Sequence, residues 1–146
     1  MAVKRHSVSG ATPIDEVDSE LRLLLIEDNA LLRTRLTSIL TVPGVMRVVD
    51  DADTQQGAID KIEQNDYDVL IVDVELRQGT GIPVIRGARE HYRSQRQPLI
   101  IVLTNYALPT VEQRCMAAGA DYFLDKMRQF HELAPLIESW GGKREQ

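Results

Sequence analysis

Three acidic side chains follow apolar runs at two places in the chain. Glu27 and Asp28 come directly after the run 21–26, and Asp73 comes directly after the run 69–72. Strands that end in carboxylates gather those acids at one edge of a sheet, where like charges about 4 Å apart repel by on the order of 4 kcal/mol at an effective dielectric near 20. A divalent cation relieves that repulsion. The pattern therefore predicts a cation site built from these three residues.

A hydroxyl group and an ammonium group complete the set of reactive side chains. Thr104 follows the aliphatic run 98–103, and Lys126 follows the run 121–124. Magnesium prefers carboxylate and water oxygens and often leaves positions for a phosphate. Phosphoryl transfer needs charge neutralisation and alignment, so a nucleophile beside a metal, an ammonium and a hydroxyl suffices. We expect Asp73 to be that nucleophile and to form an acyl phosphate.

The elements that must position these residues alternate regularly along the chain. Short aliphatic runs typical of buried parallel strands are followed by segments with helical spacing. The strands are expected at 21–26, 45–49, 68–73, 98–103 and 121–124, and the helices at 30–41, 54–64, 82–92, 109–118 and 129–140. Five such pairs predict an α/β fold, a doubly wound five-stranded parallel sheet with helices on both faces. Ligands of such folds bind beyond the carboxyl ends of the strands, where the reactive residues fall.

The two ends of the chain differ from its middle. Residues 1–20 carry Ser, Gly, Thr, Pro and scattered charges without periodicity, which is typical of a flexible extension. We expect one domain over 21–140 and a C-terminal tail over 141–146, because Gly141-Gly142 is a signal for the end of the ordered chain. Pro135 is expected to mark the start of the regular part of the last helix.

Composition excludes several classes of protein. The chain has 146 residues, 43% of them apolar, which is enough for one core. Its net charge of -5 argues against a nucleic-acid surface. The single cysteine, Cys115, cannot form an internal disulfide, and no apolar run has the length of a signal peptide or a membrane span. We expect a cytoplasmic protein that binds neither nucleic acid nor membrane directly.

Over roughly residues 21–140 the sequence resembles the receiver domains of two-component response regulators. The resemblance rests on four motifs taken together: Leu-Ile-Glu-Asp-Asn at 25–29, Val-Leu-Ile-Val-Asp at 69–73, Ile-Val-Leu-Thr at 101–104 and Ala-Gly-Ala-Asp-Tyr-Phe-Leu-Asp-Lys at 118–126. It implies a flavodoxin-like strand order 2-1-3-4-5. It also implies that Asp73 is the phosphoacceptor and that Mg2+ is the cofactor.

The resemblance assigns a role to each metal-binding residue. Asp28 and Asp73 would bind Mg2+ directly, together with the backbone carbonyl of Glu75, while Glu27 would act through a metal-bound water. Lys126 would pair with Asp73 and afterwards with the phosphoryl oxygens.

Further residues would respond to the phosphoryl group or set its lifetime. Thr104 would hydrogen-bond to the phosphoryl group, and Phe123 would be the aromatic switch that turns inward. Glu75, Asn105 and Tyr106 lie at positions that tune hydrolysis in this family, and we expect Glu75 and Tyr106 to slow or screen the attacking water.

The sequence departs from the family pattern at four places, one of which is Asn105, a residue larger than the Ala or Gly often found there. Met127 follows Lys126 where a proline with a cis peptide is usual; a cis bond before another residue costs about 2.5 to 4 kcal/mol, so this turn is either trans or strained. Arg77 stands where a proline is common, and Phe123 lacks the hydroxyl of the frequent tyrosine. None of these changes removes an essential group.

The implied partners are a histidine kinase or phosphotransfer protein as donor and a downstream protein or fused effector. A homodimer through the face of the fourth helix, fifth strand and fifth helix is a further output. Such a domain is no enzyme beyond catalysing its own phosphorylation and dephosphorylation. Two alternatives stay open. One is a degenerate receiver that binds partners without phosphorylation. The other is a Mg2+-dependent phosphohydrolase resembling haloacid dehalogenases, disfavoured because Asp73-Val74-Glu75 lacks the Asp-x-Asp pattern.

Overall fold

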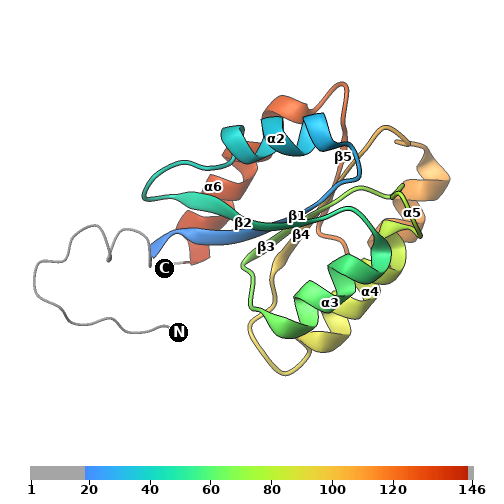
Figure 1. Ribbon diagram of the computed structural model, residues 1–146, viewed down its shortest axis with the longest axis horizontal. Coiled ribbons are helices and arrows are strands. Elements are labelled where there is room, and N and C mark those ends of the chain that lie inside the picture. Colours follow the sequence, from blue (N-terminus) through green and yellow to red (C-terminus); the bar gives the residue numbers. More distant parts are fainter. Residues whose placement is uncertain (1–18, 145–146) are drawn as a thin grey trace, which may run out of the picture.

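A parallel sheet of five strands lies between two layers of helices (Figure 1). The computed structural model describes residues 19–144. The strand order is β2-β1-β3-β4-β5, and every neighbouring pair is parallel. Both the predicted fold class and the strand order are confirmed. The strands are β1 (Leu21–Ile26), β2 (Met46–Ala52), β3 (Val69–Val72), β4 (Leu99–Thr104) and β5 (Tyr122–Asp125).

The helices divide between the two faces of the sheet. In Figure 1, α2 (Ala30–Ile39) and α6 (Leu133–Arg144) lie on one face, and α3 (Gln55–Gln64), α4 (Gly81–His91) and α5 (Pro109–Ala118) on the other. Successive side chains of a strand point to opposite faces. Strand β1 accordingly gives Leu23 and Leu25 to the core under α2 and α6, and Leu24 and Ile26 to the core under the other three helices. Both faces of the central strands are therefore buried, which explains their aliphatic runs.

Local sequence signals fix the helix starts nearest the carboxyl edge of the sheet. The Asn29 side chain accepts a hydrogen bond from the backbone N–H of Leu32 at 2.9 Å and caps α2. Thr54 caps α3 in the same way through the N–H of Gly57 at 3.0 Å. Pro109 occupies the first turn of α5, where its missing N–H costs no hydrogen bond. Asn, Thr and Pro are typical residues at these helix-start positions, so each start follows from its local sequence.

The predicted end of the last helix is wrong. Helix α6 continues through Gly141 and Gly142 to Arg144. A Cβ atom at Gly141 would lie 2.8 Å from Cδ1 of Leu21, so the glycine lets the helix pack closely on β1. Arg144 then donates to Asp68 at 2.9 Å. Tertiary contacts therefore extend this helix past a local stop signal.

Smaller differences concern the start of α6 and the second strand. The 3-10 turn η1 (Phe130–Glu132) precedes α6, which begins at Leu133, so Pro135 lies within the first turn rather than at the start. Strand β2 runs to Ala52 instead of Val49.

No peptide bond among residues 19–144 is cis, so the bond between Lys126 and Met127 is trans. No helix in this part of the chain is long and apolar enough to span a membrane. The N-terminal extension expected over 1–20 lies almost entirely outside the described residues.

Candidate functional site

The acids predicted to form a cation site do lie together, at the carboxyl ends of β1 and β3. Carboxylate oxygens of Glu27, Asp28 and Asp73 all lie within 4.8 Å of one another. Glu27 and Asp73 are buried, whereas Asp28 is exposed. The backbone N–H of Asp73 donates to the carbonyl of Ile26 at 3.0 Å, which ties the end of β3 to the end of β1. The sheet itself thus sets the spacing of the three carboxylates.

Lys126 joins two of these acids. Its Nζ atom lies 2.8 Å from Oδ2 of Asp73 and 2.8 Å from Oε1 of Glu27. The lysine is placed by β5, because its backbone N–H donates to the carbonyl of Thr104 at 2.9 Å. Burial alone would lower the pKa of Lys126, but its hydrogen bonds to Asp73 and Glu27 and their charges outweigh burial and raise it. The contact with Asp73 was expected, but the one with Glu27 was not.

The cluster carries more negative than positive charge. Burial raises the pKa of Glu27, and the charge of Asp73 raises it further, against the opposing effects of Lys126 and the Asn29 amide. One ammonium faces three carboxylates, two of them buried. Oxygen ligands in this number suit a hard divalent cation such as Mg2+. The residues therefore fit the cofactor that the sequence predicted.

Glu75 and Tyr106 pair beside Asp73. The backbone N–H of Glu75 donates to Oδ1 of Asp73 at 3.3 Å. The Glu75 carboxylate raises the pKa of the Tyr106 phenol, first by its charge and then by accepting a hydrogen bond from the hydroxyl. Tyr106 is 46% exposed, and the neighbouring Asn105 is exposed as well. This pair links the loops that follow β3 and β4, a contact that the sequence did not predict.

Thr104 and Phe123, the predicted switch residues, make other contacts. Thr104 is fully buried, and its hydroxyl oxygen accepts a hydrogen bond from the backbone N–H of Tyr106 at 3.2 Å. Within residues 19–144, no hydrogen bond joins Thr104 to Asp73. Phe123 is half-buried and packs against the core under α3, α4 and α5. The structure therefore brings Lys126 and the acids together, whereas the Thr104 hydroxyl pairs with Tyr106 and Phe123 packs on the core.

The loop after Asp73 is shaped by a glycine and an ion pair. A Cβ atom at Gly81 would collide with the carbonyl oxygen of Asp73, so this position needs glycine if α4 is to start so close to β3. Arg77 forms an ion pair with Asp53 at 3.2 Å, and this contact lowers the pKa of Asp53. The sequence shows a glycine in the segment after the third strand. Only the structure shows that this glycine is needed, because the start of α4 lies against the Asp73 carbonyl.

Comparison with known proteins identifies the family. Residues 23–138 match the response regulator receiver domain. The chain belongs to this family. The receiver domain is 32% identical over 125 residues to the transcriptional regulatory protein DesR of Bacillus subtilis, covering 85% of this chain and 60% of DesR. It is 31% identical over 128 residues to PdtaR of Mycobacterium tuberculosis, covering 86% of this chain and 60% of PdtaR. The chain thus spans only about 60% of the length of these curated relatives.

A solved structure agrees with the assignment. The receiver domain of the sensor histidine kinase PA1611 from Pseudomonas aeruginosa has a TM-score of 0.68 and 26% identity, covering 84% of this chain and 98% of that one. Receiver domains are signalling domains of two-component systems and not classical enzymes. A further relative is the hybrid signal transduction histidine kinase G of Dictyostelium discoideum, which is 25% identical over 122 residues, covering 84% of this chain and 4% of that protein.

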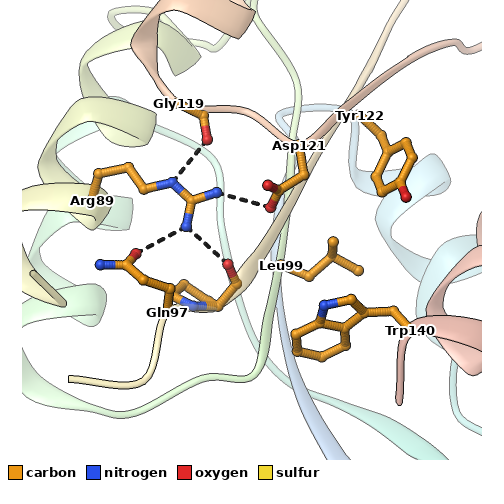
Figure 2. Close-up of a pocket in the computed structure, with 8 residues that line it drawn as sticks. Arg89, Gln97, Leu99, Gly119, Asp121, Tyr122 and Trp140 are labelled. Carbon is orange, nitrogen blue, oxygen red and sulfur yellow. Dashed lines mark hydrogen bonds and ion pairs between the residues drawn. The ribbon is translucent and has the colours of Figure 1, made fainter. Parts of the chain in front are cut away.

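The receiver domain also has a pocket at the opposite edge of its sheet. Figure 2 shows this hollow, of about 640 Å³, between Arg89, Trp140 and the first residues of β4 and β5. Arg89 donates to Gly119 and Asp121, each at 2.8 Å, to Gln97 at 2.9 Å, and to the carbonyl of Pro98 at 3.0 Å. The guanidinium is thus occupied by internal hydrogen bonds. It joins α4 to the starts of β4 and β5 and serves the fold.

Proposed function

We propose that this receiver domain accepts a phosphoryl group from a phosphohistidine donor onto Asp73. The main support for this proposal is the position of Lys126, whose Nζ atom hydrogen-bonds to both Asp73 and Glu27. A carboxylate oxygen of Asp28 also lies within 4.8 Å of an oxygen of each of these acids. Mg2+ would be held by Asp28, Asp73 and the Glu75 carbonyl, and by Glu27 through water. The similar PA1611 receiver domain has a magnesium ion coordinated in its active site cleft, which supports this cofactor.

The transfer needs one bond to form and one to break. A carboxylate oxygen of Asp73 bonds to phosphorus while the phosphorus–nitrogen bond of the donor breaks, and the electron pair of that bond leaves with the donor imidazole. Bound magnesium would neutralise charge on the phosphoryl oxygens during this exchange. Lys126 moves its hydrogen bond from Asp73 to a phosphoryl oxygen. In dephosphorylation a water attacks phosphorus, releasing inorganic phosphate and the free carboxylate.

Signal output would begin at Thr104. Its hydroxyl, which accepts from the Tyr106 N–H, turns and donates to a phosphoryl oxygen on Asp73. Phe123 then moves inward, and the face formed by α5, β5 and α6 changes. The donor is a histidine kinase or a phosphotransfer protein. The output is a protein partner, a homodimer through this face or a fused effector.

Phosphoramidate with Mg2+ tests the phosphoacceptor, because it supplies a phosphoryl group without a kinase. Intact mass should show one added phosphoryl group on the wild type and on Asp60→Asn, an exposed acid of α3, and none on Asp73→Asn. Absence of labelling on the wild type would instead indicate the degenerate interaction module. Rapid turnover of phosphomonoesters would indicate a phosphohydrolase.

The proposed switch has its own test. Beryllofluoride with Mg2+ mimics the phosphoryl group, and hydrogen exchange then reports which segments change. We expect changed protection in β5 and α5 of the wild type and of Thr110→Val, an exposed threonine of α5. Thr104→Val should bind beryllofluoride without that change, because the valine fills the same volume and lacks the hydroxyl. An unaltered exchange response in Thr104→Val would rule out Thr104 as the switch.

A further inference from the structure

Arg33 reaches from the first turns of α2 back to the end of β1, where Glu27 and Asp28 lie. Its Nη1 atom donates to the backbone carbonyl of Glu27 at 2.8 Å. Its Nε atom lies 3.9 Å from the carboxylate of Asp51, near the end of β2. Only 22% of the side chain is exposed. A single guanidinium thus connects the ends of two strands to the helix that begins beside the acidic cluster.

The location of this arginine is unusual for a helix. A cation near a helix N-terminus faces the positive end of the helix dipole, which disfavours it. The hydrogen bond from Arg33 to the Glu27 carbonyl offsets this unfavourable interaction with the helix dipole. Glu27 lies beyond Ile26, the last paired residue of β1, so its carbonyl needs a donor from outside the sheet. A charge-assisted hydrogen bond to that carbonyl is stronger than a neutral one.

Three hydrogen bonds fix the turn that carries both metal-binding acids. The N–H of Glu27 donates to the carbonyl of Ala52 at 2.9 Å, and the N–H of Asn29 donates to Oε2 of Glu27 at 3.1 Å. Arg33 makes the third bond and holds the carbonyl of the peptide group between Glu27 and Asp28. It is the one bond of the three that a substitution can remove without touching the acids or the backbone.

We propose that Arg33 is a positioning residue for the divalent cation site. By fixing the Glu27–Asp28 peptide group, it sets where the two acids stand relative to Asp73. This inference rests on the proposed magnesium site. Loss of the arginine should weaken magnesium binding by about tenfold, the lower end of what outer-shell substitutions cost metal sites. Charge alone predicts the opposite sign, because removing a nearby cation makes a cluster of acids attract Mg2+ more strongly.

The direction of the change therefore separates positioning from charge. Titration calorimetry of the full chain with Mg2+ would compare the wild type with Arg33→Ala, Arg33→Lys and Arg33→Gln. The matched control is Arg35→Ala, an exposed arginine of the same helix. We expect a Kd about tenfold higher for Arg33→Ala and a Kd within about twofold of wild type for Arg35→Ala. Arg33→Lys and Arg33→Gln keep a hydrogen-bond donor, so their Kd values should lie between those of Arg33→Ala and the wild type.

A general loss of stability would not produce this pattern. Ile137→Val removes a buried methyl group from the core under α6. It should lower the melting temperature without changing the Kd for Mg2+. For Arg33→Ala the Mg2+ concentration that half-saturates phosphoramidate labelling should rise, while the labelling rate at saturating Mg2+ stays at the wild-type value. An unchanged or lower Kd in Arg33→Ala overturns the inference. Failure of the wild type to bind Mg2+ overturns the proposed function itself, and the wild-type titration alone reveals that case.

Discussion

The Nζ atom of Lys126 lies 2.8 Å from Oδ2 of Asp73, and the same atom lies 2.8 Å from Oε1 of Glu27. The side chains of the lysine and the two acids are 10%, 7% and 3% exposed. One buried ammonium is therefore the shared counterion of two buried carboxylates. Binding a cation or a phosphoryl group at this site must redistribute those hydrogen bonds.

Lys126→Met should destabilise the protein at neutral pH. Breaking a buried ion pair by removing one partner costs about 3 kcal/mol, because the remaining charges stay buried without compensation. Since the pKa of Lys126 is raised, its contribution is present at neutral pH and is lost only as the pH rises through that raised value. Urea unfolding at pH 7 measures the loss, and Mg2+ should restore part of it. Lys143→Met, an exposed position, is the control. Equal stability of Lys126→Met and wild type without Mg2+ would contradict this account.

Removing the pair of Glu75 and Tyr106 should shorten the life of the phosphoryl group. If their contact screens Asp73 from water with about 1 kcal/mol of stabilisation, replacing both residues with Ala speeds hydrolysis by about fivefold. Tyr106→Phe keeps the ring but not the hydrogen bond, so an intermediate rate is expected. Release of inorganic phosphate after labelling measures the rate. Leu108→Ala, in the same loop and 56% exposed, should behave as wild type. An unchanged lifetime in the double variant would dispose of the screening hypothesis.

The stabilisation from Tyr67 should disappear at high pH. Burial raises the pKa of this phenol, and its 2.7 Å hydrogen bond to Asp50 raises it further. Its contribution is complete below the unfolded pKa of about 10 and is lost as the pH rises from there toward the folded pKa. Tyr67→Phe should therefore be about 1 kcal/mol less stable than wild type at pH 7. Urea unfolding at pH 7 and above pH 10 tests this, because groups common to both proteins cancel. A gap that stays constant with pH would count against the role of this phenol.

The adjacent glycines of α6 should respond differently to alanine. Gly142 has open space around its Cα, so Gly142→Ala should stabilise the helix by about 1 kcal/mol. At Gly141 the same gain is opposed by the approach of the new methyl group to Leu21, so Gly141→Ala should be neutral or destabilising. Thermal unfolding measures both changes. In a Leu21→Ala background, Gly141→Ala should become stabilising. Equal effects at both positions would mean that the packing on β1 is loose.

The sequence was sufficient to predict the fold and the residues at the carboxyl edge. Aliphatic runs that end in Asp73 or Thr104 identify buried strands. In a parallel sheet the carboxyl ends of all strands lie at the same edge. Asn29 and Pro109 marked helix starts because capping depends on a few neighbouring residues. Local patterns were enough wherever local chemistry decided the structure.

Other features depend on contacts that no local pattern contains. The second strand was predicted too short because Asp50 and Asp51 are polar, yet Tyr67 binds the first and Arg33 approaches the second. The length of α6 depends on whether Leu21 leaves room for Gly141. The sharing of Lys126 between two acids likewise depends on the distances between the strand ends. The sequence predicts which strand ends are neighbours but not how far apart their side chains lie.

The contact between Lys126 and Glu27 joins residues 99 positions apart. During synthesis the acids of β1 and β3 leave the ribosome well before the lysine that follows β5. Because domains fold as units and chains grow by only about 5–20 residues per second, there is an interval of seconds in which the acids exist without their ammonium. The site therefore cannot be assembled with its ammonium until the whole of β5 and Lys126 have been synthesised.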